Sequence, residues 1–144
     1  MDKINRELLK QIADLDSIPQ GAYNFRVNGK LDSRKSTSEI EIKTKEDEPG
    51  IDIFIKPNVV GKSVHIPVML SEAGLNDVVY NDFYVGENAD VTIIAGCGIY
   101  NCTNKLSEHD GIHTFHIGKN AKVKYIEKHL GIGSENAERV LNPT

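Results

Sequence analysis

Cys97 offers the most chemistry in this sequence, because a thiol can bind a soft metal or act as a nucleophile. It stands between Gly96 and Gly98, and His129 and Glu127 become its neighbours if two similar segments of the chain lie side by side. A thiolate and an imidazole at that spacing, with a carboxylate nearby, could bind a soft metal, hold an iron–sulfur fragment or activate the thiol. The alternative is that Cys97 fills a narrow turn, since free cysteine is among the most buried residue types.

The histidines upstream of His129 are a second candidate group. His109, His113 and His116 form a run that superficially resembles the spacing of metal ligands. In an extended segment, however, alternation places His113 on the inner face with Phe115 and His116 on the outer face. A zinc site made of all three is therefore disfavoured, because structural zinc needs four converging ligands. His113 is expected to be either a satisfied interior histidine or a partner for Cys97.

The segments that would bring these residues together are two near-copies, FYVGENADVTII at 83–94 and FHIGKNAKVKYI at 115–126, offset by 32 residues. They share six of twelve positions, and such self-similarity at a fixed period indicates stacked repeats. Each copy reads as strand, turn and strand, and a fainter third copy lies at 55–66. Stacking predicts equivalent side chains about 4.8 Å apart and places Cys97 beside His129.

The remaining pattern predicts a mainly β fold with a short N-terminal helix. Apolar residues at helical spacing predict a helix over 3–15, whose buried face is expected to cover one end of the stack. Residues 1–20 then form a helix and linker, and 21–144 form a β domain that looks truncated at its C-terminal edge or closes that edge with a second copy. Pro67 predicts a bulge or an edge in its strand.

The composition and the motifs argue against several classes of function. The net charge of −4 without a basic stripe argues against nucleic acid as the main partner. No apolar run approaches a membrane span, and without a leader-like segment at its start the chain is expected to be cytoplasmic, with Cys97 and Cys102 as thiols. No nucleotide-binding or hydrolase motif occurs, and carboxylate pairs such as Asp77 and Asp82 are expected in polar loops without a pocket. The sequence therefore does not read as a conventional enzyme.

Two stretches resemble the SufB/SufD family of iron–sulfur cluster assembly proteins. They are GLNDVVYNDFYVGENADVTIIAGCG at 74–98 and HDGIHTFHIGKNAKVKYIEKH at 109–129, and the resemblance runs through most of residues 22–143. The Gly96-Cys97 pair after a strand and the histidine-containing strand followed by Ala-x-Val-x-Tyr are its most specific parts. The resemblance implies a right-handed parallel β-helix and a chain that corresponds to the N-terminal portion of the family's core domain.

The resemblance also implies a function and partners. Family members are scaffolds on which sulfur and iron are assembled, working as SufB/SufD-type subunits bound to a SufC-type ATPase. Cys97 resembles the family cysteine associated with accepting or relaying sulfur, and His113 falls on a family histidine. A transient iron–sulfur cluster or a persulfide is the expected cargo, although family members are longer and their ATPase dock and dimer contact have no counterpart here. The rival interpretation is a non-catalytic β-solenoid interaction module in which the thiol only packs. For the partners, a homo-oligomer stays open as an alternative.

Overall fold

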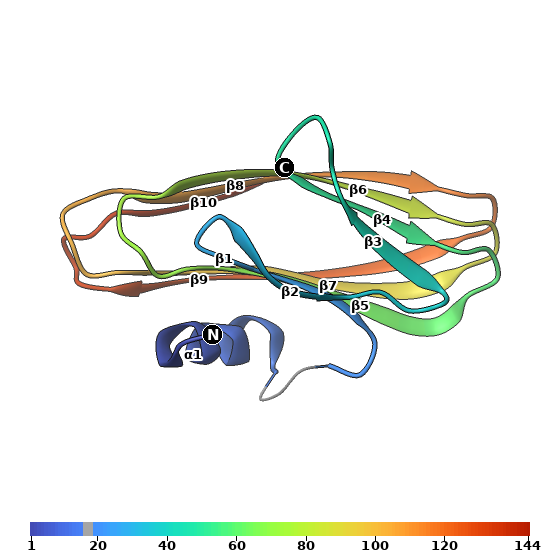
Figure 1. The fold of residues 1–144 in the computed structure, drawn as a ribbon, viewed down its shortest axis with the longest axis horizontal. Helices are drawn as coiled ribbons and strands as arrows, with labels where there is room; N and C mark the ends of the chain where they lie inside the picture. Colours follow the sequence, from blue (N-terminus) through green and yellow to red (C-terminus); the bar gives the residue numbers. More distant parts are fainter. Residues whose placement is uncertain (16–18) are drawn as a thin grey trace.

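The computed structural model describes residues 1–15 and 19–144, which form one helix and two facing β-sheets (Figure 1). The elements are α1 (Lys3–Ala13), β1 (Ala22–Val27), β2 (Lys30–Lys35), β3 (Ile40–Thr44), β4 (Gly50–Ile55), β5 (Val60–Leu70), β6 (Asn76–Val85), β7 (Asp90–Asn101), β8 (Ser107–Ile117), β9 (Lys122–Gly133) and β10 (Arg139–Pro143). The mainly β fold with a short N-terminal helix is therefore confirmed. The predicted division at residue 20 stays a prediction, and part of its linker lies outside the described residues.

Successive strands from β4 onward alternate between the two sheets. Each strand from β4 to β8 pairs in parallel with the strand two places further along the chain. The first sheet has the order β2-β1-β5-β7-β9, and the second has the order β10-β8-β6-β4-β3. The antiparallel pairs β1–β2 and β3–β4 end the two sheets on the same side, so both sheets are mixed, and neither closes on itself.

The two strong repeats lie on neighbouring strands in the predicted register. Phe83 pairs with Phe115 between β6 and β8, and Val91 pairs with Val123 between β7 and β9. The rings of Phe83 and Phe115 stack with their centroids 4.8 Å apart, which is the spacing of neighbouring strands. Because their side chains repeat at this spacing, the apolar faces of both sheets form one continuous core between them.

The turn of each repeat explains its Gly-x-Asn signature. Asn58, Asn88 and Asn120 have positive φ angles of 65°, 62° and 59°, a conformation that asparagine tolerates better than most residues. Their amides form a ladder, since Asn88 donates to Asn58 at 3.3 Å and Asn120 donates to Asn88 at 3.4 Å. A Cβ at Gly86 would lie 2.4 Å from the backbone nitrogen of Pro57, so only glycine fits there. The third copy around Asn58 is confirmed.

Helix α1 begins and ends at two aspartates. The side chain of Asp2 accepts a hydrogen bond from the backbone N–H of Asn5 at 2.9 Å, which caps the first turn. Asp14 adopts the left-handed conformation, with φ of 54°, and ends the helix just short of the predicted boundary. No helix in the described part of the chain is long and apolar enough to cross a membrane.

The helix packs on the outer face of the first sheet, so the prediction that it covers an end of the stack is wrong (Figure 1). Leu8 and Ile12 are almost completely buried there. The reason lies in β7, where Gly96 and Gly98 leave room on the outer face. A Cβ at Gly98 would meet Leu8 Cδ2 at 3.0 Å, and one at Gly96 would lie 3.2 Å from Cβ of Ile12. The glycines around Cys97 therefore form the seat of the helix.

Two local predictions also need correction. Cys97 lies within β7 and not on a turn, because β7 continues to Asn101 and the chain turns only between Cys102 and Leu106. Pro67 lies in β5, which is a central strand and not an edge. Its missing N–H is accommodated because the pairing of β5 with β1 is interrupted between His65 and Val68 without a change of register.

Candidate functional site

Cys97 points between the two sheets and is 1% exposed. It packs in a small apolar cluster with Val68, Leu70 and Ile99. In register it lies opposite His129 on β9 and opposite Val68 on β5. The predicted side-by-side placement of Cys97 and His129 is therefore found in the structure, with the thiol itself shielded from solvent.

Glu127 joins the other predicted site residues. Its Oε1 lies 3.2 Å from Nε2 of His129 and 3.6 Å from Nε2 of His113, although the two histidines belong to opposite sheets. The side-chain amide of Asn81 lies 3.4 Å from Nδ1 of His113. An amide nitrogen can only donate, so Nδ1 of His113 accepts and its Nε2 carries the proton that faces Glu127. We call His113, Glu127 and His129 the Glu127 group. The polar side-chain contacts described for His113 are with Glu127 and Asn81, and none is with Cys97.

A second buried group was missed in the sequence. Asp77 on β6 is bound by Arg26 on β1, with Nη2 2.8 Å and Nε 3.1 Å from its two carboxylate oxygens. Nδ1 of His109 lies 3.2 Å from Oδ2 of Asp77 and donates to it, because an ionised carboxylate only accepts. We call Arg26, Asp77 and His109 the Asp77 group. The expectation that Asp77 lies in a polar loop is wrong, because alternation along β6 puts it on the same inner face as Phe83.

The two groups approach each other at Gly111. A Cβ at that position would lie 3.1 Å from Nε2 of His113 and 3.4 Å from Nε2 of His109. The absence of a side chain at Gly111 therefore leaves room for both rings in the interior. His116 is on the outer face, where Nε2 contacts Asp82 at 2.8 Å, so the predicted opposite orientations of His113 and His116 are found. Asp82 thus lies on the outer face of β6, not in a loop.

The surroundings of the site lower the pKa values of the two carboxylates and raise that of the thiol. Burial alone would raise the pKa of Asp77, but the hydrogen bonds and charges of His109 and Arg26 lower it to about 2. Burial opposes ionisation of Glu127 as well, and the contacts with His113 and His129 lower its pKa. For Cys97, burial raises the pKa far above the usual range of a thiol, and the charges of Asp77 and Glu127 raise it further. Cys97 is therefore held as a neutral thiol.

Cys97 and its neighbours offer a thiol, imidazoles and carboxylates, which are ligand types that iron and zinc use. Among residues 1–15 and 19–144, no three or more such side chains are arranged as a metal-binding set. Glu127 instead satisfies the two imidazoles of its own group through direct contacts. Cys102 is exposed and lies outside both buried groups, after the end of β7.

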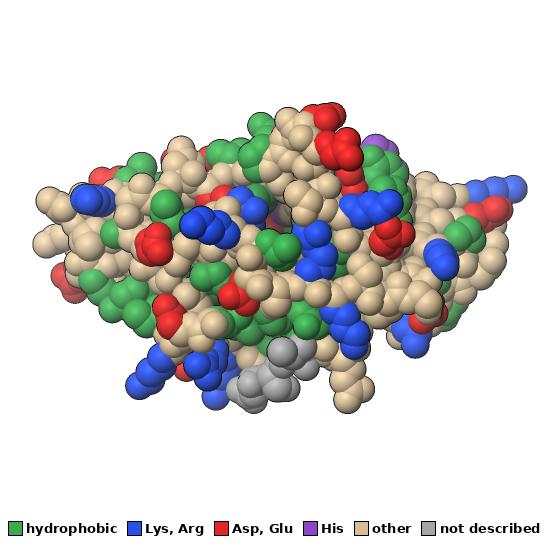
Figure 2. All heavy atoms as spheres, viewed as in Figure 1, with side chains coloured by type: hydrophobic (Ala, Val, Ile, Leu, Met, Phe, Trp, Pro, Cys, Tyr) green, Lys and Arg blue, Asp and Glu red, His purple; other side chains and the backbone are tan. Residues whose placement is uncertain are grey.

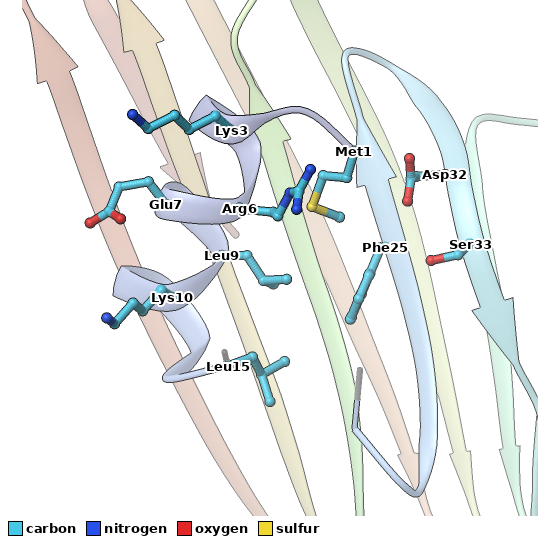
Figure 3. Close-up of a pocket in the computed structure, with 10 residues that line it drawn as sticks. All are labelled: Met1, Lys3, Arg6, Glu7, Leu9, Lys10, Leu15, Phe25, Asp32 and Ser33. Atoms are coloured by element: carbon cyan, nitrogen blue, oxygen red, sulfur yellow. The ribbon is translucent and has the colours of Figure 1, made fainter. Parts of the chain in front are cut away.

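A pocket beside α1 lies away from this site. It has a volume of about 730 Å³ and is bounded by α1 and the hairpin β1–β2 (Figure 3). Leu9, Leu15 and Phe25 point toward one another at its base, while Lys3 and Lys10 point outward. None of the predicted site residues is among those that line it, so it has no connection with the chemistry of Cys97.

Comparisons of the chain with models of protein families, with curated proteins and with solved structures find no match. The function therefore has to be argued from the two buried groups and the thiol beside them.

Proposed function

We propose that this chain is an iron–sulfur cluster assembly scaffold of SufB/SufD type that accepts or relays sulfur through Cys97. One observation carries the proposal: Cys97 lies in register with His129, and Glu127 connects His129 to His113 from the opposite sheet. The finer architecture that we propose with it is a right-handed parallel β-helix, which the alternation of strands between two sheets and their parallel registers support.

The proposed chemistry is the transfer of one sulfur atom. The thiolate of Cys97 attacks the outer sulfur of a donor persulfide, R–S–SH, the S–S bond breaks, and R–S⁻ leaves with the bonding electrons. Cys97 then carries the persulfide, Cys–S–SH. Because burial keeps Cys97 protonated, the thiol must first lose its proton. His129, in register on the next strand, is the base that we propose for it, and Glu127 would stabilise the resulting imidazolium.

The proposal treats the chain as a scaffold and not as an enzyme. The sulfur on Cys97 would be passed on for cluster assembly, so a transient iron–sulfur cluster is cargo shared with other subunits. The partners that we propose are SufB/SufD-type subunits and a SufC-type ATPase, in the cytoplasm. Neither nucleic acid nor a membrane is among the proposed partners. The residues that would act in this chain are Cys97, His113, Glu127 and His129.

The rival function is a β-solenoid interaction module without sulfur chemistry. The burial of Cys97 among Val68, Leu70 and Ile99 favours it, because a shielded thiol with a raised pKa behaves as a small apolar side chain. Under this alternative the two buried groups serve only to hold the sheets together.

An anaerobic sulfur-transfer assay separates the two functions. The chain is incubated with cysteine persulfide, and the peptides containing Cys97 and Cys102 are examined for the mass of one added sulfur atom. Cys102→Ser is the control that removes the exposed thiol, and Cys97→Ser removes the proposed acceptor. We expect sulfur on Cys97 in the wild type and in Cys102→Ser, and more iron and sulfide bound after reconstitution than in Cys97→Ser. Sulfur found only on Cys102 would favour the interaction module.

A further inference from the structure

A second cavity opens between the two hairpins that end the sheets. It has a volume of about 400 Å³ and is bounded by β1–β2 on one side and β3–β4 on the other. Figure 2 shows Lys and Arg side chains gathered around the middle of this face of the molecule. Four basic residues line the cavity, Arg26, Lys30, Arg34 and Lys45, against one acidic residue, Glu48.

The charges of these basic residues are not equally neutralised. Arg26 is bound by Asp77, and Lys45 lies 2.6 Å from Asp52 and 2.9 Å from Asp82. Arg34 differs, because its Nε donates at 2.8 Å to the neutral side chain of Asn24.

No carboxylate in the described part of the chain pairs with Arg34. Its guanidinium is partly desolvated at the cavity wall, and this burial lowers its pKa. A half-buried guanidinium without a counterion is a site for an anion, which its planar array of N–H donors can hold.

One residue that lines the cavity, Val68, lies next to Cys97. Val68 on β5 and Asn81 on β6 line the cavity from the two sheets. Val68 is the register partner of Cys97 and packs in the same apolar cluster. The cavity floor is thus one strand spacing, about 4.8 Å, from the strand that carries the thiol. Asn81 also contacts His113 of the Glu127 group.

We propose that this cavity is the access route by which a small anionic persulfide reaches Cys97, with Arg34 as its anion-binding residue. The inference rests on the proposed function and adds the class of sulfur donor to it. A persulfide is a stronger acid than the parent thiol, so it is bound at Arg34 as the anion R–S–S⁻. Before transfer its outer sulfur takes up the proton that His129 removes from Cys97, which gives the R–S–SH of the proposed step. Cys97 is 1% exposed, so local opening at Val68 is required before the sulfur end of the bound anion reaches the thiol.

Thiosulfate is a stable probe of the anion site. It is titrated into the ¹⁵N-labelled full chain, and amide shifts are followed in the wild type, in Arg34→Gln, in Arg34→Lys and in the control Arg6→Gln on α1. We expect shifts at Asn24, Arg34 and Val68, binding at least tenfold weaker in Arg34→Gln, and wild-type binding in Arg6→Gln. Arg34→Lys keeps the charge and should bind more tightly than Arg34→Gln. Absent binding, or equal binding in Arg34→Gln, would overturn the proposal.

The rate of sulfur uptake by Cys97 from cysteine persulfide is the second readout. We expect it to fall at least tenfold in Arg34→Gln, and to fall in the wild type when thiosulfate competes. An unchanged rate in Arg34→Gln would refute the access route while leaving the relay through Cys97 intact. Thiosulfate binding at Arg34 without any sulfur on Cys97 would instead refute the relay. Circular dichroism of each variant shows that a loss is not caused by unfolding.

Discussion

Arg26 and Asp77 join the two sheets through the interior, with the guanidinium Nη2 2.8 Å from the carboxylate Oδ1. Arg26 belongs to β1 in the first sheet and Asp77 to β6 in the second, and the two are 51 residues apart in the chain. His109 on β8 binds the other oxygen of the same carboxylate. This carboxylate is therefore satisfied from both sheets, and its removal would leave a partly buried guanidinium unpaired.

The substitution Asp77→Asn is expected to lower the free energy of unfolding by about 2 kcal/mol at neutral pH. The pKa of Asp77 is about 2 in the folded chain, against an ordinary value of 3.8. A depressed pKa gives stability that is present above about pH 4 and is lost as the pH falls toward 2. Urea unfolding at a series of pH values should show the difference between wild type and variant shrinking in that window. A difference that is constant from pH 7 to pH 2 would contradict this assignment.

The substitution Gly96→Ala is expected to loosen the helix from the sheet. The added Cβ would lie 2.8 Å from the backbone oxygen of Lys128 and 3.2 Å from Ile12, so strand and helix must both shift. We expect a loss of roughly 1–3 kcal/mol in unfolding free energy and faster amide exchange in α1. Gly131→Ala on β9 is the matched control, because the nearest neighbours of its Cβ would be side-chain atoms of Arg139 and not backbone. Equal losses in both variants would show that the space left by Gly96 is not needed for packing α1 on the sheet.

The repeats could be predicted because the backbone conformation of each turn restricts which residue types can occupy it. A left-handed asparagine recurs at all three turns, and a glycine without room for a Cβ recurs at the two turns of the strong repeats, so the period is visible in one chain. The placement of Cys97 beside His129 followed directly from that period. Alternation along each strand likewise separated the inner His113 from the outer His116.

The Asp77 group could not be predicted in the same way. Its members come from three strands, and the pairing of Arg26 with Asp77 depends on which hairpin faces which strand across the interior. The position of α1 was accessible in principle, since an inward Cys97 makes Gly96 and Gly98 point outward. The position of α1 was not predicted because a cysteine between two glycines is also typical of a turn.

The asparagine ladder gives a test of how the turns contribute. Asn88→Ala removes both the amide ladder and a residue that tolerates a φ of 62°, so we expect a loss of about 2 kcal/mol. Asn88→Gly restores the conformational freedom but not the ladder, and should lose less than Asn88→Ala. Thermal and urea unfolding of both variants measures the difference. If Asn88→Gly is at least as destabilised as Asn88→Ala, the positive φ at this position costs alanine nothing measurable, which contradicts the assigned role of the backbone conformation.

The two thiols should differ sharply toward a neutral alkylating reagent. Cys102 is exposed, whereas Cys97 is 1% exposed and its pKa is raised by burial. We expect iodoacetamide to label Cys97 at least about a hundredfold more slowly than Cys102, because labelling requires the sheets to open. Raising the pH to about 9 should not remove this gap, since burial both shields Cys97 and raises its pKa. Peptide mass spectrometry of the wild type and of Cys102→Ser measures both rates.

Comparing the rates of alkylation and of sulfur uptake at Cys97 tests whether the persulfide uses a specific route. Iodoacetamide is neutral and gains nothing from the unpaired charge of Arg34, whereas an anionic persulfide would be concentrated in the cavity that Val68 closes. A thiol that is inert to iodoacetamide and yet takes up sulfur in an Arg34-dependent manner is therefore the signature of a guided route. A Cys97 that is equally slow toward both reagents behaves as a packing residue, and fast alkylation of Cys97 would contradict its burial.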